Sequence, residues 1–166
     1  ARDAGSGWRR AHPGDSLVVD EVTMTVLAPA PGWADSLRDP NEASVVVRVR
    51  VGTFRMIFTG DAEAREEDWL VANARDLLRA DVLKVGHHGS STSSTASFLD
   101  AVRPRLALIS VGAGNMYRHP SAAVVRALGA AGAVTLRTDR VGSVVVRTDG
   151  RRVEVEASGE RWPLIP

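Results

Sequence analysis

The segment DVLKVGHHGS, residues 81–90, passes directly from a short apolar strand pattern into two adjacent histidines flanked by glycines. Upstream, the strand-like stretch FRMIFTGD ends on Asp61, and downstream LALISVGAG leads to NMYRHP and His119. Each of these strand patterns ends on polar residues that can bind a ligand. Because ligands of open α/β sheets bind beyond the carboxyl ends of the strands, the pattern predicts an active site at one edge of a sheet.

The composition is that of an ordinary globular domain. A chain of 166 residues has the length of about one domain, and its hydrophobic (44%) and charged (25%) fractions are average. The net charge of +1 gives no indication of a nucleic-acid or membrane partner, so such binding would need a local patch. No apolar run approaches the ~18 residues of a membrane span. The absence of cysteine excludes thiolate metal ligands, disulfides and a cysteine nucleophile.

Strand and helix patterns alternate through the chain. Alternating apolar residues predict a strand over 17–27 and a hairpin over 45–58, separated by a proline-rich loop over 28–44. The order β-α-β-α-β-α-β, followed by a terminal meander, predicts a layered α/β fold. The other predicted elements are helices over 62–80, 94–102 and 119–132, strands over 81–85, 106–111, 133–138, 143–148 and 153–157, and a turn at 140–142.

We expect a single folded domain over residues 17–158. Residues 1–16 are polar and rich in turn-forming residues, which is typical of a linker or of the remnant of a preceding segment. His12 in this segment is expected to be a solvated loop residue. Residues 159–166 are expected to form a tail.

Asp61 and the histidines have the side chains that a divalent metal requires. Asp61 either caps the following helix or binds a metal that generates a hydroxide nucleophile. His87 and His88 are adjacent in a glycine-rich loop, which favours ligand or phosphate contacts over a core role for both. His119 is either a helix-entry residue or a further ligand. The predicted metal ligands are therefore Asp61, His87, His88 and His119.

A second group of residues could contact a phosphate. Lys84 is the polar residue of an apolar strand, and it either extends to the surface or supplies positive charge to a phosphate. Ser90 and the serines after it either donate hydrogen bonds to an anion or cap a helix. The predicted phosphate- or substrate-binding residues are Lys84, Ser90, Ser110 and Asn115, and the predicted catalytic residues are Asp61, Lys84, His87 and His88.

The run TGD, ADVLKVGHHGSSTSS, PRLALISVGAGNMYRHP and RTDRVGSVVV resembles the metallo-β-lactamase-like domain of ComEC-type competence proteins, the DNA-internalisation channels, over roughly residues 12–150. The resemblance implies an extracytoplasmic, metal-dependent phosphodiesterase domain of a bacterial membrane protein. Such a domain is thought to use zinc or manganese and to degrade the non-transported DNA strand during uptake. Carried over, Asp61 is a bridging or shared ligand, Lys84, His87 and His88 form the lysine-histidine motif, and Asn115 and His119 belong to the closing motif.

One motif of this family is absent. Members carry a His-x-His-x-Asp-His metal motif in an amino-terminal half, whereas this sequence has four histidines and none in that pattern. Two metals of the zinc type need about six to eight ligands, more than this chain offers. We therefore expect the carboxyl-terminal half of an αββα sandwich, a mixed sheet with helices on one face. A chain shortened in this way can lack the metal.

Three functional hypotheses follow. The first is part of a DNA-uptake nuclease that is weakly active or inactive alone, with single-stranded or duplex DNA, the missing amino-terminal half and a membrane channel as partners, and otherwise monomeric. The second is a non-catalytic module that binds DNA or another anion, or serves a structural role. The third is a stand-alone hydrolase of this fold with another substrate, which the closing motif disfavours.

Overall fold

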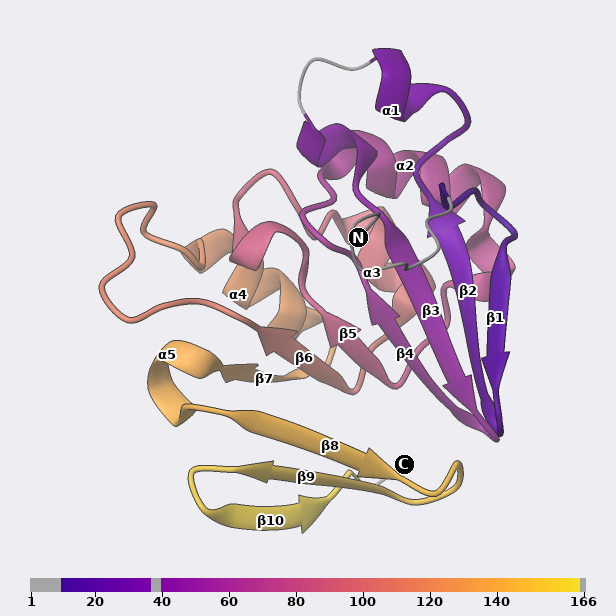
Figure 1. Cartoon of the computed structure of the whole chain (residues 1–166). Helices are drawn as coiled ribbons and strands as arrows, with labels where there is room; N and C mark the ends of the chain where they lie inside the picture. The colour runs from indigo at the N-terminus through magenta and orange to yellow at the C-terminus, as the bar shows by residue number, and fades with distance from the viewer. Residues whose placement is uncertain (1–9, 37–39, 165–166) are drawn as a thin grey trace, which may run out of the picture.

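The computed structural model describes residues 10–36 and 40–164, which form two facing β-sheets (Figure 1). The larger sheet has seven strands in the order β1 to β7, and the smaller has the order β10-β9-β8. Strands β1 to β4 pair antiparallel, whereas β4 to β7 pair parallel. The predicted α/β class with a mixed sheet is confirmed. The strands are β1 (Ser16–Val19), β2 (Val22–Ala28), β3 (Val46–Val51), β4 (Phe54–Phe58), β5 (Val82–Lys84), β6 (Leu106–Ile109), β7 (Val134–Arg137), β8 (Val144–Thr148), β9 (Val153–Ala157) and β10 (Glu160–Pro163).

The longer helices lie on the face of the large sheet that points away from the small sheet (Figure 1). They connect the parallel strands β4 to β7, as expected for successive strands that run in one direction. None of the helices in the described part of the chain has the length and hydrophobicity of a membrane span. The helices are α1 (Trp33–Ser36), η2 (Pro40–Ala43), α2 (Ala64–Asn73), η3 (Arg75–Leu77), η4 (Gly86–Gly89), α3 (Ala96–Val102), α4 (Ala122–Ala130) and α5 (Thr138–Val141), where η denotes a 3-10 helix.

Strand β5 contributes to two hydrophobic cores. Leu83 is buried between the large sheet and the helices, whereas its neighbour Val82 is buried between the two sheets. Successive side chains of a strand point to opposite faces, so a strand covered on both faces must be apolar at every such position. This requirement explains the apolar residues Val82, Leu83 and Val85 that precede the two histidines.

Several predicted boundaries are wrong. The single strand expected over 17–27 is a hairpin, because Asp20 adopts a left-handed backbone (φ 50°) that aspartate tolerates better than most residues. The helix expected over 62–80 ends at Asn73, whose side-chain amide donates a hydrogen bond to Trp69 O (2.8 Å) and so competes with the helical pattern. The predicted loop contains α1 and η2, the predicted turn lies partly in α5, and β10 lies in the expected tail.

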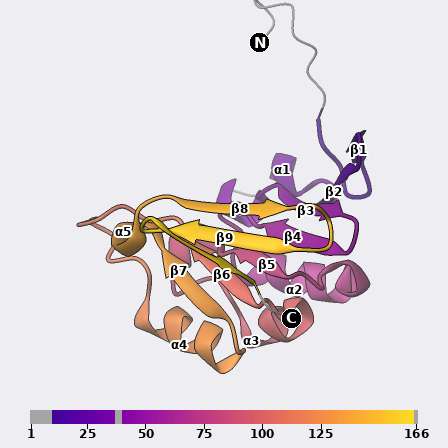
Figure 2. The same cartoon turned by 90° about the horizontal axis from the view of Figure 1, so that it is seen from below.

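One face of the large sheet is only partly covered by the small sheet. A cross-strand row of apolar residues runs along this face from Met56 on β4 through Val49 and Met24 to Leu17 on β1. Met56 packs against the core between the sheets, whereas Met24 is 37% and Leu17 is 57% exposed. Figure 2 shows the β1–β2 hairpin extending beyond the small sheet. The apolar face therefore continues past the strands that cover it.

Two buried glutamates tie α2 to its neighbours. Glu66 accepts a hydrogen bond from Ser44 N (3.1 Å), and Glu67 accepts bonds from Ser94 N (2.6 Å) and Thr95 N (2.7 Å) ahead of α3. Glu66 is completely buried, and its Oε1 atom has no partner. Burial raises the pKa of Glu66 to about 8, with a smaller contribution from the charge of Glu67, although the bond from Ser44 opposes the shift. Glu66 is therefore protonated in the folded protein near neutral pH.

We expect Glu66→Gln to make the protein more stable at alkaline pH. The pKa of Glu66 is about 8 in the folded protein against an ordinary value of 4.5, so between these pH values only the folded state holds the proton. Stability therefore falls as pH rises through this window, and each unit of pKa difference corresponds to about 1.4 kcal/mol. The uncharged glutamine removes this loss, giving a gain of a few kcal/mol at pH 9 relative to pH 5, measurable by urea denaturation. The exposed control Glu160→Gln should show no such pH-dependent gain, and an equal effect of Glu66→Gln at both pH values would contradict the assignment.

Candidate active site

The candidate site lies where three parallel strands end. Phe58, Lys84 and Leu108 are aligned across β4, β5 and β6. Because these strands run in the same direction, the residues that follow them meet at one edge of the sheet. Asp61 follows β4, the two histidines follow β5 in η4, and Ser110 follows β6.

Asp61 is the centre of the charged cluster at this edge. Its Oδ1 atom lies 3.6 Å from His88 Nε2 and 3.9 Å from Lys84 Nζ. The backbone N–H of Asp61 donates a hydrogen bond to Ser44 Oγ (3.1 Å), and the ammonium of Lys84 donates one to Gly60 O (2.7 Å). Three of the predicted catalytic residues, Asp61, Lys84 and His88, are therefore brought together.

Lys84 is the single lysine of the sequence, which otherwise uses arginine as its basic residue. Its side chain is largely buried, and burial lowers its pKa while the charge of Asp61 opposes this shift. A compact ammonium held beside a carboxylate is a point charge suited to a phosphate oxygen. The role of Lys84 in phosphate binding stays a prediction.

Both histidines of η4 are oriented through Nδ1. His88 Nδ1 lies 2.6 Å from the carbonyl oxygen of Ser110, and His87 Nδ1 lies 2.8 Å from Glu63 Oε1. Since a carbonyl and a carboxylate oxygen accept hydrogen bonds, Nδ1 is the donor in each pair. Nε2 of each ring is then left to bind another group, as in histidines that ligate metals.

Glu63 was not predicted from the sequence. Its Oε1 atom accepts hydrogen bonds from His87 Nδ1 and from Thr92 Oγ1 (2.8 Å). It stands two residues after Asp61, just before α2, and acidic residues are common at the start of a helix for electrostatic reasons. For this reason the sequence gives no sign that Glu63 contacts His87. The contact forms because the loop after β5 lies close to Glu63 in the folded protein.

The backbone around the histidines is strained. His87 (φ 44°) and His88 (φ 53°) both adopt the left-handed conformation, which non-glycine residues rarely adopt. The loop is also tightly packed, because a Cβ atom on Gly86 would lie 2.7 Å from Ala62 O and one on Gly89 would lie 2.5 Å from the Pro120 side chain. Strain held in place by such packing is typical of functional sites.

His119 lies beside η4 but away from Asp61. Its ring centroid is 5.7 Å from that of His87 and 5.8 Å from that of Tyr117, to which it is nearly parallel (16°). Burial lowers the pKa of His119, and the positive charges of His87 and His88 lower it further. The neutral imidazole is therefore favoured, which is the form that binds a metal.

The remaining predicted phosphate-binding residues support the loops of the site. Ser90 is buried, and its hydroxyl lies 2.9 Å from Thr92 Oγ1. The amide of Asn115 bonds to the backbone on both sides of His119, through His119 N (2.8 Å) and His119 O (2.8 Å). Ser110 contacts His88 through its carbonyl group. Roles of these three side chains in substrate binding stay predictions.

The donor set at this edge does not fit a complete metal centre. Among the residues that the structure describes, no group of three or more histidine, aspartate or glutamate side chains is arranged to hold a metal. Asp61 and His88 offer a pair of donors, whereas a catalytic zinc needs about three protein ligands. The rings of His87 and His119 contact each other edge to face. The assignment of these four residues as ligands stays a prediction.

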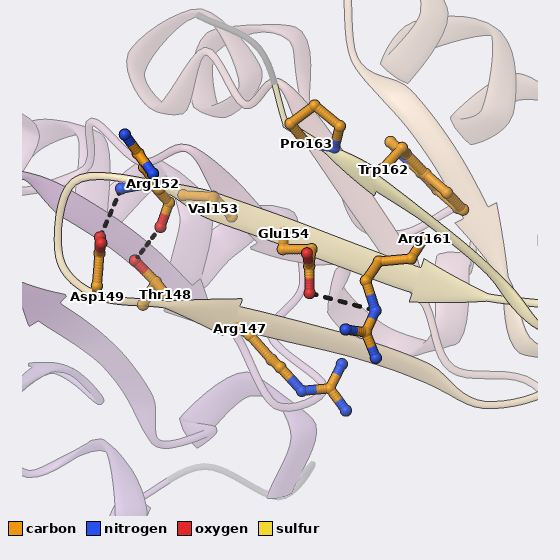
Figure 3. A pocket seen from close by; sticks show the side chains of 9 residues that line it. All are labelled: Arg147, Thr148, Asp149, Arg152, Val153, Glu154, Arg161, Trp162 and Pro163. Carbon is orange, nitrogen blue, oxygen red and sulfur yellow. Dashed lines mark hydrogen bonds and ion pairs between the residues drawn. The ribbon is translucent and has the colours of Figure 1, made fainter.

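A hollow lies away from this site, on the small sheet. Figure 3 shows its lining, which includes Arg147, Arg161 and Trp162. Both arginines pair with Glu156, at 2.6 Å and 2.9 Å, and Arg161 also pairs with Glu154 at 3.3 Å. Because the glutamates neutralise Arg147 and Arg161, these two arginines have little charge left to attract a phosphate.

His12 is not among the residues of the candidate site. It is exposed, and its Nδ1 atom lies 3.7 Å from Asp15.

The fold and the sequence define the class of this protein. Residues 5–113 match the sequence profile of the metallo-beta-lactamase superfamily, and the chain belongs to this superfamily. The fold is similar to that of CmlA, a diiron beta-hydroxylase from Streptomyces venezuelae, with a TM-score of 0.53 over 75% of this chain and 32% of that one. At 14% sequence identity, this likeness concerns the fold alone.

Particular relatives are competence and recombination proteins. The chain is 36% identical over 152 residues to ComE operon protein 3 of Bacillus subtilis and 42% identical over 106 residues to competence protein ComA of Neisseria gonorrhoeae. It is 38% identical over 125 residues to recombination protein 2 of Haemophilus influenzae. The alignments cover 91%, 64% and 75% of this chain but only 19%, 15% and 16% of these relatives. The resemblance to competence proteins is therefore confirmed, for a chain that spans less than a fifth of their length.

Lys84 offers a direct check on the electrostatics of the site. Because it is the single lysine, 13C-labelled lysine gives one side-chain NMR signal that can be titrated in metal-free buffer. We expect a midpoint below the ordinary pKa of 10.5, because burial outweighs the opposing charge of Asp61. Asp61→Asn should lower the midpoint further, whereas the remote control Asp100→Asn should leave it unchanged. A midpoint that stays unchanged in Asp61→Asn would show that the two groups do not interact.

Proposed function

We propose that this chain is part of a metal-dependent phosphodiesterase domain that cleaves DNA during competence-related DNA uptake, and that it is incomplete as a catalyst. The observation that carries the proposal is the cluster of Asp61, Lys84 and His88 at the carboxyl edge of parallel strands. Its support is the membership of the chain in the metallo-beta-lactamase superfamily and its similarity to competence proteins.

The roles of the residues follow from their contacts. Asp61 and His88 present a carboxylate oxygen and a ring nitrogen to the same space and would supply two donors to a divalent metal, zinc or manganese. Lys84 provides the adjacent positive charge for a phosphate oxygen. Glu63 orients the ring of His87. The remaining metal donors must come from residues outside this set.

The partly covered face of the large sheet supports the proposal that this chain is incomplete as a catalyst. Apolar rows on β1 to β3 extend past the small sheet, and in the described part of the chain β8 pairs along one side only, with β9. Additional strands beside β8 would cover this face, including Leu17 (57% exposed) and Phe58 (41% exposed). Large exposed apolar patches commonly mark an interface. We infer that a further segment completes the small sheet and brings the missing donors to Asp61.

The setting that we propose is an extracytoplasmic domain of a larger bacterial membrane protein that contains a channel. Its support is the small share, 15% to 19%, of each competence relative that the chain covers. DNA is the proposed substrate. The chain by itself is proposed to be a monomer.

The alternative is a module that binds DNA or another anion without cleaving it. The observation in its favour is the incomplete donor set of the described residues. Under this alternative, Lys84 and the neighbouring loops would retain an anion-binding edge. Completion of the metal site would then give no catalysis.

A nuclease assay separates the two functions. We expect the isolated chain to cleave labelled linear DNA weakly or not at all with Mn²⁺ or Zn²⁺, because it lacks metal donors. A longer polypeptide that adds a His-x-His-x-Asp-His segment ahead of this chain should cleave at least about 100-fold faster, within the range that activation by a metal-bound hydroxide provides.

Substitutions in the longer polypeptide test the site itself. Asp61→Ala should abolish cleavage, whereas Asp100→Ala, which removes an exposed carboxylate paired with Arg75, should not. Robust metal-stimulated cleavage by the isolated chain would overturn the proposed incompleteness. Cleavage by neither polypeptide would favour the binding module.

A further inference from the structure

The loop between β6 and α4 exposes two large apolar side chains beside the candidate site. Met116 is 89% and Tyr117 is 77% exposed, the highest values among large hydrophobic side chains of the described residues. Neither belongs to a hydrophobic core of the protein. An aromatic ring that is not needed for folding and lies at a candidate active site is available for a ligand.

The ring of Tyr117 is held in place although it is exposed. It is stacked nearly parallel on His119 (5.8 Å between centroids, 16°), and His119 in turn contacts the ring of His87 (5.7 Å). Asn115 fixes the loop through hydrogen bonds to the backbone of His119. The ring of Tyr117 is therefore held by a stack on His119, whose ring meets that of His87 edge to face. An ordered ring loses little entropy when it binds a ligand.

A hollow of about 460 Å³ separates Tyr117 from His88. Its wall includes Ser110 and Thr138, so it opens at the same strand edge as Asp61 and Lys84. A hollow of this size can contain a nucleotide unit, with a flat ring on one side and the charged cluster nearby.

We propose that Tyr117 is a base-stacking residue that holds an unpaired base of single-stranded DNA while the adjoining phosphate reaches Lys84. The inference rests on the proposed function and adds to it the strand state of the substrate and a residue that selects it. Both faces of a base inside a duplex are already stacked on its neighbours, whereas an unpaired base has a face free for an aromatic ring. The stack of Tyr117 on His119 then extends by one base.

The test uses the fact that Tyr117 is the single tyrosine of the sequence. The full chain labelled with 3-fluorotyrosine gives one 19F NMR signal, which is followed in EDTA so that no cleavage occurs. A 12-nucleotide oligothymidylate should shift this signal through the ring current of a stacked base. An abasic strand of equal length and charge, and a 12-base-pair duplex, should shift it at least fivefold less at the same concentration. Equal shifts from all three probes, or no shift from oligothymidylate up to millimolar concentration, would overturn the proposal.

Variants separate stacking from other effects of the loop. By fluorescence anisotropy in EDTA, Tyr117→Ala should bind labelled oligothymidylate about 5- to 150-fold more weakly, the range expected for one stacked base. Tyr117→Phe keeps the ring and should bind within about twofold of the unsubstituted chain, as should Met116→Ala in the same loop. Equal weakening by Tyr117→Ala and Met116→Ala would show a loop effect and overturn the stacking role.

The binding readouts are independent of hydrolysis. A longer polypeptide that cleaves DNA while Tyr117→Ala binds oligothymidylate normally would uphold the proposed function and sink the stacking role. If Tyr117→Ala lost affinity for oligothymidylate but no form of the protein cleaved DNA, the stacking role would stand and the proposed function would fail.

Discussion

The parallel pairing of β4, β5 and β6 is the constraint on which the site depends. Phe58, Lys84 and Leu108 are aligned in neighbouring strands, so the residues just after each strand are placed at one edge. Asp61 comes from the first strand and the histidine pair from the second, while the carbonyl of Ser110 after the third orients His88. A slip of one residue in β5 would turn its side chains to the opposite faces and separate Lys84 from Asp61. The two hydrophobic cores that bury Val82 and Leu83 prevent such a slip, so packing and site geometry have a common origin.

The sequence predicted the features that depend on local patterns. Apolar runs indicated the parallel strands. Glycines around the histidines indicated a close approach of the backbone to its surroundings, and a Cβ atom at Gly86 or Gly89 would indeed collide with neighbouring residues. Asp61, Lys84 and His88 were identified because each is polar where its surroundings are apolar or glycine-rich. These signals need no knowledge of distant contacts.

Other features had no clear signal in the sequence, and some of them depend on contacts between distant residues. Glu63 has the pattern of an ordinary helix-start residue, and its bond to His87 exists only because the loop after β5 folds over α2. The role of Ser90 in anion binding stays a prediction, and its buried hydroxyl lies close to that of Thr92, two residues along the chain. The turn at Asp20 was missed because it lacks glycine, which is the usual signal for a left-handed turn residue.

The partly covered sheet has an energetic meaning. Burial of apolar surface contributes about 25 cal/mol per Å², so the exposed side chains on β1 and β2 forgo stabilisation that a covering layer would provide. The second core beneath the small sheet is correspondingly small, with Phe54, Val82 and Leu106 among its few buried members. A layer added beside β8 would enlarge this core and lie next to the site edge. Completion of the fold and completion of the site would then be one event.

Electrostatics explain how the residues at this edge are ordered. The carboxylate of Asp61 is 40% exposed, and Lys84 and His88 both approach its Oδ1 atom. The ammonium of Lys84 is in turn satisfied by Gly60 O, and the ring of His88 by Ser110 O. The contacts of Lys84 and His88 with Asp61 therefore hold the ends of β4 and β5 together at one edge of the sheet.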